Sequence, residues 1–411
     1  MENHISHPFL RLSDTNRPYR DKLVEAATRV IDSGCYIGGP EVETLETELA
    51  ALCHVPHAVC VSNGLDALRL ILRAYIIMGR LAPGDEVIVP DMTFVATALA
   101  VVDSGLRMVP VDVNLRTGNL DSTLVEEAIT PCTRAIIPVH LYGRICCDKT
   151  LLDLVERHRL LMIEDAAQAL GAENPHKGVA DSRMAGGLGH AAAFSFYPTK
   201  NTGALGDAGA VTTHDAVLAE TVRTLANYGY RGHYNSIYQG FNCRMDAIQA
   251  AMLRVKLPFA DYENEYRRAQ AREYNRLIDN PHIIKPLSPA IPASHIYYQY
   301  SILLNPTTQN SQISRSSQNS HNYQIYHNSQ SIEAERCLRD AFREHMLAAG
   351  IETGVHYPLA IHSQPCFPDY NHLTFPAAET IAATQVSLPV GPTTPLEAIP
   401  AIAQAINTFR P

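Results

Sequence analysis

Short apolar runs alternate with amphipathic stretches through the first half of the chain, and this alternation predicts strands separated by helices. Apolar side chains recur at helical spacing in residues 65–77, 93–102 and 149–157. The strand-like runs lie near residues 58–61, 86–89, 107–111, 135–139, 160–163, 191–197 and 208–213. Alternation at this spacing favours an α/β fold in which helices flank a mixed, mostly parallel sheet.

The second half of the chain predicts a smaller α/β domain. A charged helix is expected over 262–277, a strand over 297–304 and another helix over 332–349. Since a chain of 411 residues exceeds the usual size of one domain, we divide it into a large domain, 1–257, and a small one, 258–411. The large domain includes the N-terminal segment.

Residues 306–331 are dominated by Ser, Asn and Gln. Such a composition buries too little apolar surface to offset the entropy of ordering. We therefore expect a mobile insertion in the small domain, with a partner-binding segment as the alternative.

Lys200 follows the apolar run 191–197 at the point where Pro198 ends the strand, because proline cannot donate to a sheet ladder. A lysine at the lip of a sheet can lose its proton when water is excluded and attack a carbonyl carbon. A lone lysine in a loop is more often simply solvated. A second segment upstream favours the chemical interpretation.

Asp165 follows the apolar run 160–163 in the same way. Ligands of open α/β sheets bind at the carboxyl ends of the strands. A carboxylate there can hold a protonated pyridine nitrogen, although an isolated Asp165 would also suit a helix N-cap. Together, Lys200 and Asp165 indicate pyridoxal phosphate.

A phosphate site is expected where the strand ending at Val61 turns into the helix that Ser62-Asn63-Gly64-Leu65 opens. Gly64 allows a close backbone approach, and the first amides and the helix dipole favour an anion. A simple capped turn is the alternative for this segment alone. No G-x-G-x-x-G dinucleotide fingerprint follows the strand.

Taken in order, several short motifs give the chain a family resemblance. They are Tyr36-Ile37-Gly38-Gly39-Pro40, Asn63-Gly64, Pro90 to Thr97, Glu164 to Gln168, Ser195 to Lys200, Asn227-Tyr228-Gly229, Gly240 to Ala251, and His356-Tyr357-Pro358 with His362 following. With these motifs the chain resembles the DegT/StrS family of pyridoxal-phosphate-dependent nucleotide-sugar aminotransferases, along nearly its whole length.

The resemblance implies a fold-type-I aminotransferase, a homodimer with shared active sites, and a role for each matching residue. Lys200 would bond the cofactor and shuttle the proton, and Asp165 would pair with the pyridine nitrogen. The other cofactor contacts would be Gln168 at the 3-hydroxyl, Phe94 on the ring face, and Gly64, Leu65, Ser195 and the partner subunit's Asn242 at the phosphate. Many members have threonine at the position of Leu65. Arg244, His356, Tyr357 and His362 would face the substrate.

Charge and cysteine content narrow the function classes further. With 33 Lys and Arg against 42 Asp and Glu, the formal charge is −9, which argues against general nucleic-acid binding. Nine scattered cysteines without a C-x-x-C pair form neither a disulfide framework nor a zinc site, and they fit a reducing cytoplasm. The first residues lack the basic-then-apolar pattern expected of a signal peptide, and no run approaches the roughly 18 apolar residues of a membrane helix.

The expected reaction moves an amino group from an amino acid, L-glutamate by resemblance, to a keto group of a nucleotide-linked sugar. The form of the turn at 62–68 resembles members that aminate the 3-keto carbon of a dTDP-linked 6-deoxyhexose, and 4-amination is the alternative. A sugar dehydratase of the same family would carry histidine at the position of Lys200. A non-catalytic sensor that merely binds the cofactor is a further alternative, but it would not need Lys200, Asp165 and Gln168 all intact.

Overall fold

A seven-stranded sheet organises the larger part of the computed structural model, which describes residues 5–179, 182–305 and 329–411. Its strand order is β1-β7-β6-β5-β4-β2-β3. β7 runs antiparallel to both of its neighbours, and the other pairs are parallel, so the predicted mixed, mostly parallel sheet is confirmed. The strands are β1 (His57–Val61), β2 (Glu86–Pro90), β3 (Arg107–Val111), β4 (Thr133–Ile136), β5 (Leu161–Asp165), β6 (Ala191–Ser195) and β7 (Gly209–Thr213).

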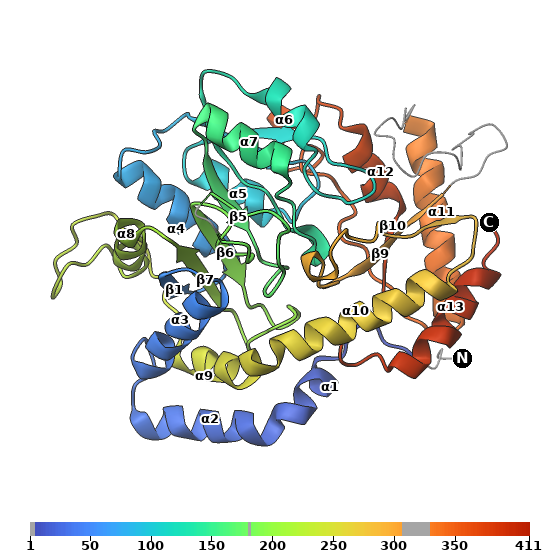
Figure 1. Ribbon diagram of the computed structural model, residues 1–411, viewed down its shortest axis with the longest axis horizontal. Coiled ribbons are helices and arrows are strands. Elements are labelled where there is room, and N and C mark those ends of the chain that lie inside the picture. The colour runs from blue at the N-terminus through green and yellow to red at the C-terminus, as the bar shows by residue number, and fades with distance from the viewer. Residues whose placement is uncertain (1–4, 180–181, 306–328) are drawn as a thin grey trace.

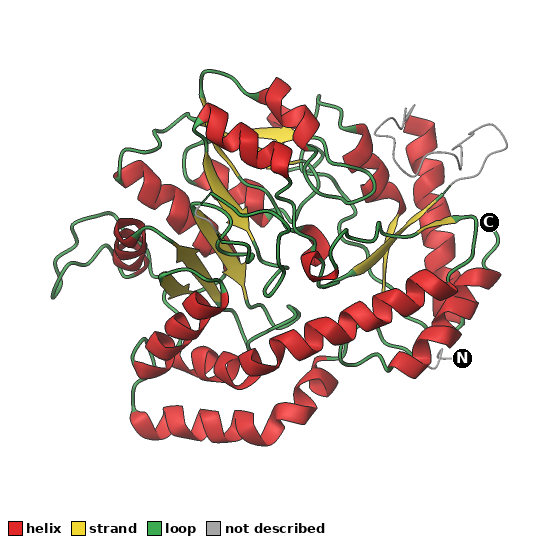
Figure 2. Cartoon of the chain, viewed as in Figure 1, coloured by secondary structure: helices red, strands yellow, loops and turns green. Residues whose placement is uncertain are grey.

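Helices cover both faces of this sheet (Figures 1 and 2). Successive strand side chains point to opposite faces, so Val87 and Ile163 pack on one side while Ile88 and Met162 pack on the other. The first face is covered by α4 (Gly64–Ile77), α5 (Ala96–Asp103) and α8 (Ala216–Ala226). The opposite face is covered by α3 (Pro40–Leu52), α6 (Ser122–Ala128), α7 (Lys149–His158) and α9 (Ala247–Lys256).

A second, antiparallel sheet of three strands has an apolar core of its own, in the order β10-β9-β8. The long helix α10 (Ala260–Leu277) runs from α9 toward this sheet (Figure 1). The remaining elements here are β8 (Ile283–Ile284), β9 (Tyr300–Leu304), β10 (Gln385–Leu388), α11 (Ser329–Ala348), α12 (Pro376–Thr384) and α13 (Ile399–Thr408). The division of the chain at residue 257 stays a prediction.

The N-terminal segment contacts both parts of the molecule. The amide of His7 donates to the carbonyl of Gly350, while α2 (Arg20–Ser33), which follows α1 (Leu12–Asn16), packs on α9 through Leu23 and Met252. Among the described residues, no helix is long and apolar enough to cross a membrane.

Two elements begin later than the sequence pattern predicts. The helix expected from residue 93 begins at Ala96, and Thr93 lies before it with its hydroxyl 2.9 Å from that of Thr97. The strand expected from residue 297 begins at Tyr300, since Tyr297 has a φ of 50°, which a strand does not allow. The predicted insertion at 306–331 lies outside the described residues except for the start of α11.

Candidate active site

A cavity of about 390 Å³ opens at the carboxyl ends of β5 and β6, beside the start of α4. Many of the residues predicted from the sequence converge here: Gly64, Leu65, Phe94, Asp165, Gln168, Ser195, Lys200, His356 and Tyr357 all line it. Asn242, Arg244 and His362 do not. The other lining residues are Asn63, Leu68, Thr93, Ala96, Val139, Ala167, Tyr197, Thr199, Asp207 and Tyr298.

Lys200 reaches the cavity from the tight turn that follows β6. Its amide donates to the carbonyl of Tyr197 at 2.8 Å, and a Cβ at Gly203 would lie 2.4 Å from the carbonyl oxygen of Pro198, so the turn requires glycine there. The Nζ atom lies 5.2 Å from the centre of the Tyr298 ring, a cation–π contact, and Lys200 makes no ion pair with any described residue. Its amine is therefore free for chemistry.

Asp165, the last residue of β5, presents a buried carboxylate to the same cavity. The Thr97 hydroxyl donates to its Oδ2 at 2.8 Å, and the Ala167 amide donates to its Oδ1 at 3.2 Å. Within the described part of the chain it has no cationic partner. A negative charge oriented in this way can receive a positively charged group of a ligand.

The neighbouring residue, Glu164, fixes the end of β5 from the other side. Its carboxylate accepts hydrogen bonds from the amides of Gly186, Leu188 and Gly189 and contacts Nε2 of His140 at 2.9 Å. Nδ1 of His140 accepts from the amide of Cys146, which leaves Nε2 as the donor of a neutral imidazole. This buried network holds the strand that carries Asp165.

The start of α4, predicted as an anion cradle, lies close against the end of β6. The Asn63 side chain accepts from the amide of Asp66 at 2.8 Å, which caps the helix. A Cβ on Gly64 would lie 2.8 Å from that of Ser195, so glycine is needed to bring the helix terminus against β6. The free amides of the first turn and the Ser195 hydroxyl consequently lie at one end of the cavity, where an anion is favoured.

Gln168 is held in one orientation at the opposite wall. The amide of Tyr142 donates to its Oε1 at 2.6 Å, and its Nε2 donates to the Tyr357 hydroxyl at 3.1 Å, which leaves one amide hydrogen for a ligand. The Tyr357 ring lies 5.4 Å from the Phe94 ring. Phe94 is 52% exposed, so it lies at the cavity mouth rather than in the core.

His356 is neutral at pH 7. Burial, together with the nearby Lys200 charge, lowers its pKa to about 4. Its Nδ1 lies 3.0 Å from the Ser387 hydroxyl, and its ring stacks on Phe9 at 5.7 Å. A neutral imidazole in this position can exchange hydrogen bonds with a polar ligand without adding charge.

The three predicted residues outside the cavity make other contacts. Asn242 is exposed, and its backbone forms an isolated antiparallel β-bridge with Asn227. The Arg244 guanidinium donates to the Asn227 side chain at 3.0 Å and lies 5.3 Å from the Tyr228 ring centre. His362 is buried, with Nδ1 2.6 Å from Asp91 and Nε2 3.5 Å from Glu379, so its position within one chain gives no access to a substrate.

Sequence reasoning missed Tyr298 and Thr97 as site residues. Tyr298 belongs to the segment before β9, and nothing in its local pattern distinguishes it from its neighbour Tyr297. Thr97 left a trace in the sequence, because it stands four residues after Thr93 in the predicted helix 93–102, a spacing that places two residues on one face. That spacing alone does not identify a site residue. In the described ranges, no group of three or more His, Cys, Asp or Glu side chains could hold a metal ion.

The donor set of the cavity fits pyridoxal phosphate. A lysine without an ion pair, a carboxylate without a cation, an oriented amide and an anion cradle surround one volume. The site is thus able to hold an aromatic aldehyde that carries a phosphate group at one end and a basic ring nitrogen at the other.

Comparisons with known proteins agree with this chemistry. Residues 19–321 and 308–407 match the family model of the DegT/DnrJ/EryC1/StrS aminotransferase family. A Streptomyces venezuelae protein named dTDP-3-amino-3,4,6-trideoxy-alpha-D-glucose transaminase is 41% identical over 392 residues, which cover 94% of this chain and 91% of that protein.

Solved structures are similar over almost the entire chain. S. venezuelae DesV has a TM-score of 0.84 and 38% identity, with 98% of this chain and 97% of that chain covered. Bacillus subtilis NtdA, solved with the bound cofactor PMP, has a TM-score of 0.81 and 27% identity, with 98% and 85% covered.

Proposed function

Since the chain belongs to the DegT/DnrJ/EryC1/StrS aminotransferase family, we propose that it transfers an amino group from an amino acid to a keto group of a nucleotide-linked sugar. One observation carries this proposal: Lys200 and Asp165, each without an ion-pair partner among the described residues, face one cavity that has an anion cradle at its end. A binding protein without catalysis would not need a free amine there.

The cofactor of this reaction is pyridoxal 5′-phosphate, which, when bound, stores the amino group between the two half-reactions and acts as an electron sink. The backbone amides of Gly64 and Leu65, in the first turn of α4, and the Ser195 hydroxyl would hold its phosphate. Asp165 would hold the ring nitrogen, and Gln168 the 3-hydroxyl. Phe94 would cover the ring face.

The chain's own groups do the remaining work. Lys200 Nζ takes a proton from the reacting carbon and returns it, because it is the free amine of the cavity. The Thr97 hydroxyl keeps the Asp165 carboxylate oriented, which favours the protonated ring nitrogen. Phe94 and Tyr357 limit the access of water at the mouth, and the neutral His356 offers a hydrogen bond to a sugar hydroxyl.

The site would be completed in a homodimer. Asn242, which resemblance assigns to the phosphate, does not line the cavity of its own chain. Phe94 and Tyr197, which line the cavity, are 52% and 51% exposed, an apolar exposure that a second copy would cover. We therefore assign the phosphate contact to Asn242 of the partner subunit. Arg244 and Tyr228, which contact each other close to Asn242 in the sequence, would face the partner's substrate.

The favoured acceptor is a dTDP-linked 3-keto-6-deoxyhexose, and the favoured donor is L-glutamate. The turn Ser62-Asn63-Gly64-Leu65 and the name of the S. venezuelae relative, a 3-amino-sugar transaminase, both support 3-amination. A 4-keto sugar is the alternative acceptor, because the chemistry is the same for whichever carbonyl is held over the cofactor.

Two measurements test this function. Adding L-glutamate to the purified, cofactor-loaded protein should bleach the absorbance of the bound aldehyde, and a cofactor-binding sensor would leave the spectrum unchanged. Supplying 3-keto and 4-keto dTDP sugars and locating the new C–N bond by NMR then identifies the acceptor. An amine found only at carbon 4 would refute the acceptor and leave the aminotransferase intact.

The cysteines support a cytoplasmic location for this protein. All nine cysteines are free thiols, including the buried, adjacent Cys146 and Cys147. Buried thiols without disulfides fit a reducing compartment.

A further inference from the structure

A second, smaller cavity lies between the two sheets and is lined by cationic side chains without a carboxylate. Its accessible volume is about 30 Å³. Arg116 and Arg144 reach it from the part of the chain that builds the large sheet, and Lys285, His295 and Gln299 from the part that leads into the small sheet. The described lining is completed by Leu115, Thr117, Gly118, Tyr142, Ile284, Pro286, Ser301, Leu303 and Ile381.

The two arginines lack charged partners. Neither Arg116 nor Arg144 makes an ion pair with a described residue, and Nε of Arg116 is buried with no hydrogen-bond acceptor. Among the described residues, the Arg144 guanidinium donates to the carbonyl of Leu287 alone, and burial lowers its pKa. A guanidinium group that loses hydration without gaining a charged partner is costly unless an anion compensates for it.

The other polar groups leave room for that anion. Lys285 donates to the carbonyls of Asn275 and Ile278 at the end of α10, at 2.8 and 2.9 Å, and adds positive charge nearby. His295 is neutral, since burial and Arg144 lower its pKa well below the usual value. Gln299 is more than nine-tenths buried, and its Oε1 atom has no hydrogen-bond partner among the described residues. If the side-chain amide of Gln299 is rotated by half a turn, its Nε2 takes the place of Oε1 and presents a hydrogen-bond donor to the cavity.

We propose that this cavity binds one small monovalent anion, of the size of chloride, between Arg116 and Arg144. A volume of about 30 Å³ holds one or two water-sized particles, which is too little for a phosphate ester or a nucleotide. The bound anion would join the two parts of the chain at the wall behind the active site. That wall includes Tyr142, whose amide holds Gln168 and whose hydroxyl donates to the carbonyl of His356.

Crystals of the wild-type holoenzyme soaked in sodium bromide provide the direct test, since bromide replaces chloride and scatters anomalously. We expect one anomalous peak in contact with both guanidinium groups. Density for water alone at this position, with no anomalous peak, would overturn the proposal. The soak requires no substitution, so its result is independent of any effect on folding.

Thermal unfolding tests the same site in solution. When potassium chloride replaces potassium gluconate at constant ionic strength, the wild-type Tm should rise by about 2 °C, because a ligand bound only by the folded state stabilises it. The double variant Arg116→Gln, Arg144→Gln should lose this response and, without chloride, be at least as stable as wild type. Arg134→Gln, which removes an exposed arginine on β4, is the matched control and should keep the response. A double variant that responds like wild type would contradict the assignment.

Discussion

At the scale of single residues, the candidate site depends on side chains whose charges and protons are not used elsewhere in the described chain. Lys200 is held near an aromatic ring instead of a carboxylate, at 5.2 Å from Tyr298. Asp165 is oriented by the neutral hydroxyl of Thr97 at 2.8 Å instead of by a cation. An ion pair between the two would have satisfied both charges and removed both from the reaction.

We predict that Lys200→Ala abolishes transamination, because the variant lacks the amine that bonds the cofactor and moves the proton. Borohydride reduction of the wild-type protein followed by peptide mapping should find the cofactor on the peptide that contains Lys200. The variant should retain cofactor only without a covalent bond. Lys149→Ala, an exposed lysine paired with Asp153, is the control and should remain active. A label on any other lysine would sink the assignment.

His356 leads to a prediction about pH. Its pKa is about 4 in the folded protein, and an ordinary histidine titrates near 6.5, so between these values the unfolded chain binds the additional proton. The stability that the neutral His356 contributes is therefore complete above about pH 6.5 and declines as the pH falls toward 4, by about 3 kcal/mol in total.

The measurement compares wild type with His356→Gln by chemical denaturation at pH 7 and pH 4.5. The wild type should lose more stability than the variant over this interval, and NMR should find the His356 ring signals titrating near pH 4. Burial is the main cause of the shift, and the Lys200 charge adds to it, so Lys200→Ala should move the midpoint upward. Equal acid sensitivity of wild type and variant would contradict a buried, neutral His356.

At the scale of elements, the cradle depends on how closely the start of α4 approaches β6. Gly64→Ala would place a methyl group 2.8 Å from the Cβ and 3.3 Å from the Cα of Ser195. Since a backbone cannot yield as a flexible side chain can, the helix must shift, which should cost about 1–3 kcal/mol of stability and weaken cofactor binding. Titrating the apoprotein with pyridoxal phosphate, together with denaturant unfolding, measures both losses. An unchanged affinity would separate this helix from the phosphate.

For the neighbouring residue, Leu65, we predict a substitution that strengthens cofactor binding. Leu65→Thr adds a hydroxyl to the first turn of α4, and a hydrogen bond to a charged phosphate contributes about 1.5–3 kcal/mol, so the affinity for the cofactor should increase roughly tenfold or more. Leu65 also packs partly against the core that α4 forms with the sheet, so the variant should unfold at lower denaturant concentration. Weaker cofactor binding by Leu65→Thr would show that the helix start points elsewhere.

Features that depend on a local run of residues can be predicted from the sequence, and features that depend on pairing between distant segments cannot. Buried strands read as continuous apolar runs, and a polar residue that ends such a run, such as Asp165 or Lys200, is visible without a structure. The direction of β7 is not visible, because it depends on pairing with β1 and β6 across long stretches of chain. The role of His362 depends on Asp91, 271 residues earlier, and no local pattern reports that pairing.

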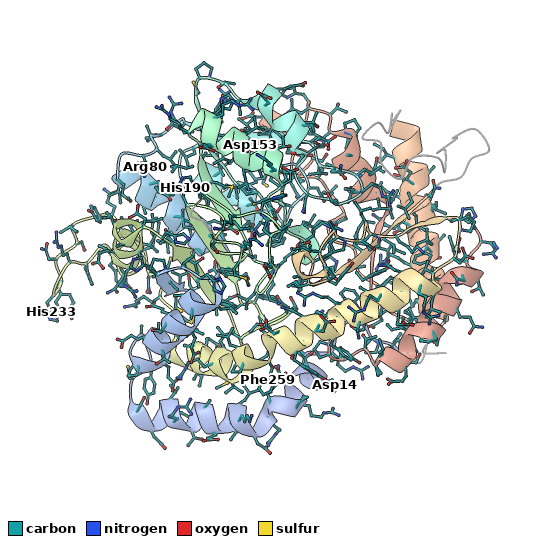
Figure 3. All side chains as sticks on the ribbon, in the orientation of Figure 1. Asp14, Arg80, Asp153, His190, His233 and Phe259 are labelled. Carbon is teal, nitrogen blue, oxygen red and sulfur yellow. The ribbon has the colours of Figure 1, made fainter. Side chains whose placement is uncertain are left out.

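At the scale of the whole molecule, the proposed sharing of the active site between subunits depends on the position of Asn242. The loop after α8 projects from the body of the protein, with His233 near its far end (Figure 3), and Asn242 follows it without reaching the cavity of its own chain. Tyr234 in this loop is 78% exposed. An aromatic, projecting segment of this kind is costly in a monomer and useful when it packs on a second copy.

We therefore predict that Lys200→Ala and Asn242→Ala chains complement each other in mixed dimers. One of the two sites in such a dimer combines the intact Lys200 of one chain with the intact Asn242 of the other, and the second site lacks both residues. Mixing equal amounts makes about half of the dimers mixed, so about a quarter of wild-type activity should return, while each variant alone stays nearly inactive. Two different affinity tags isolate the mixed dimers, and a mixture of Lys200→Ala with wild type controls for subunit exchange. Purified mixed dimers that remain as inactive as the parent variants would mean that Asn242 serves its own chain, because complementation requires the two residues to meet across the interface.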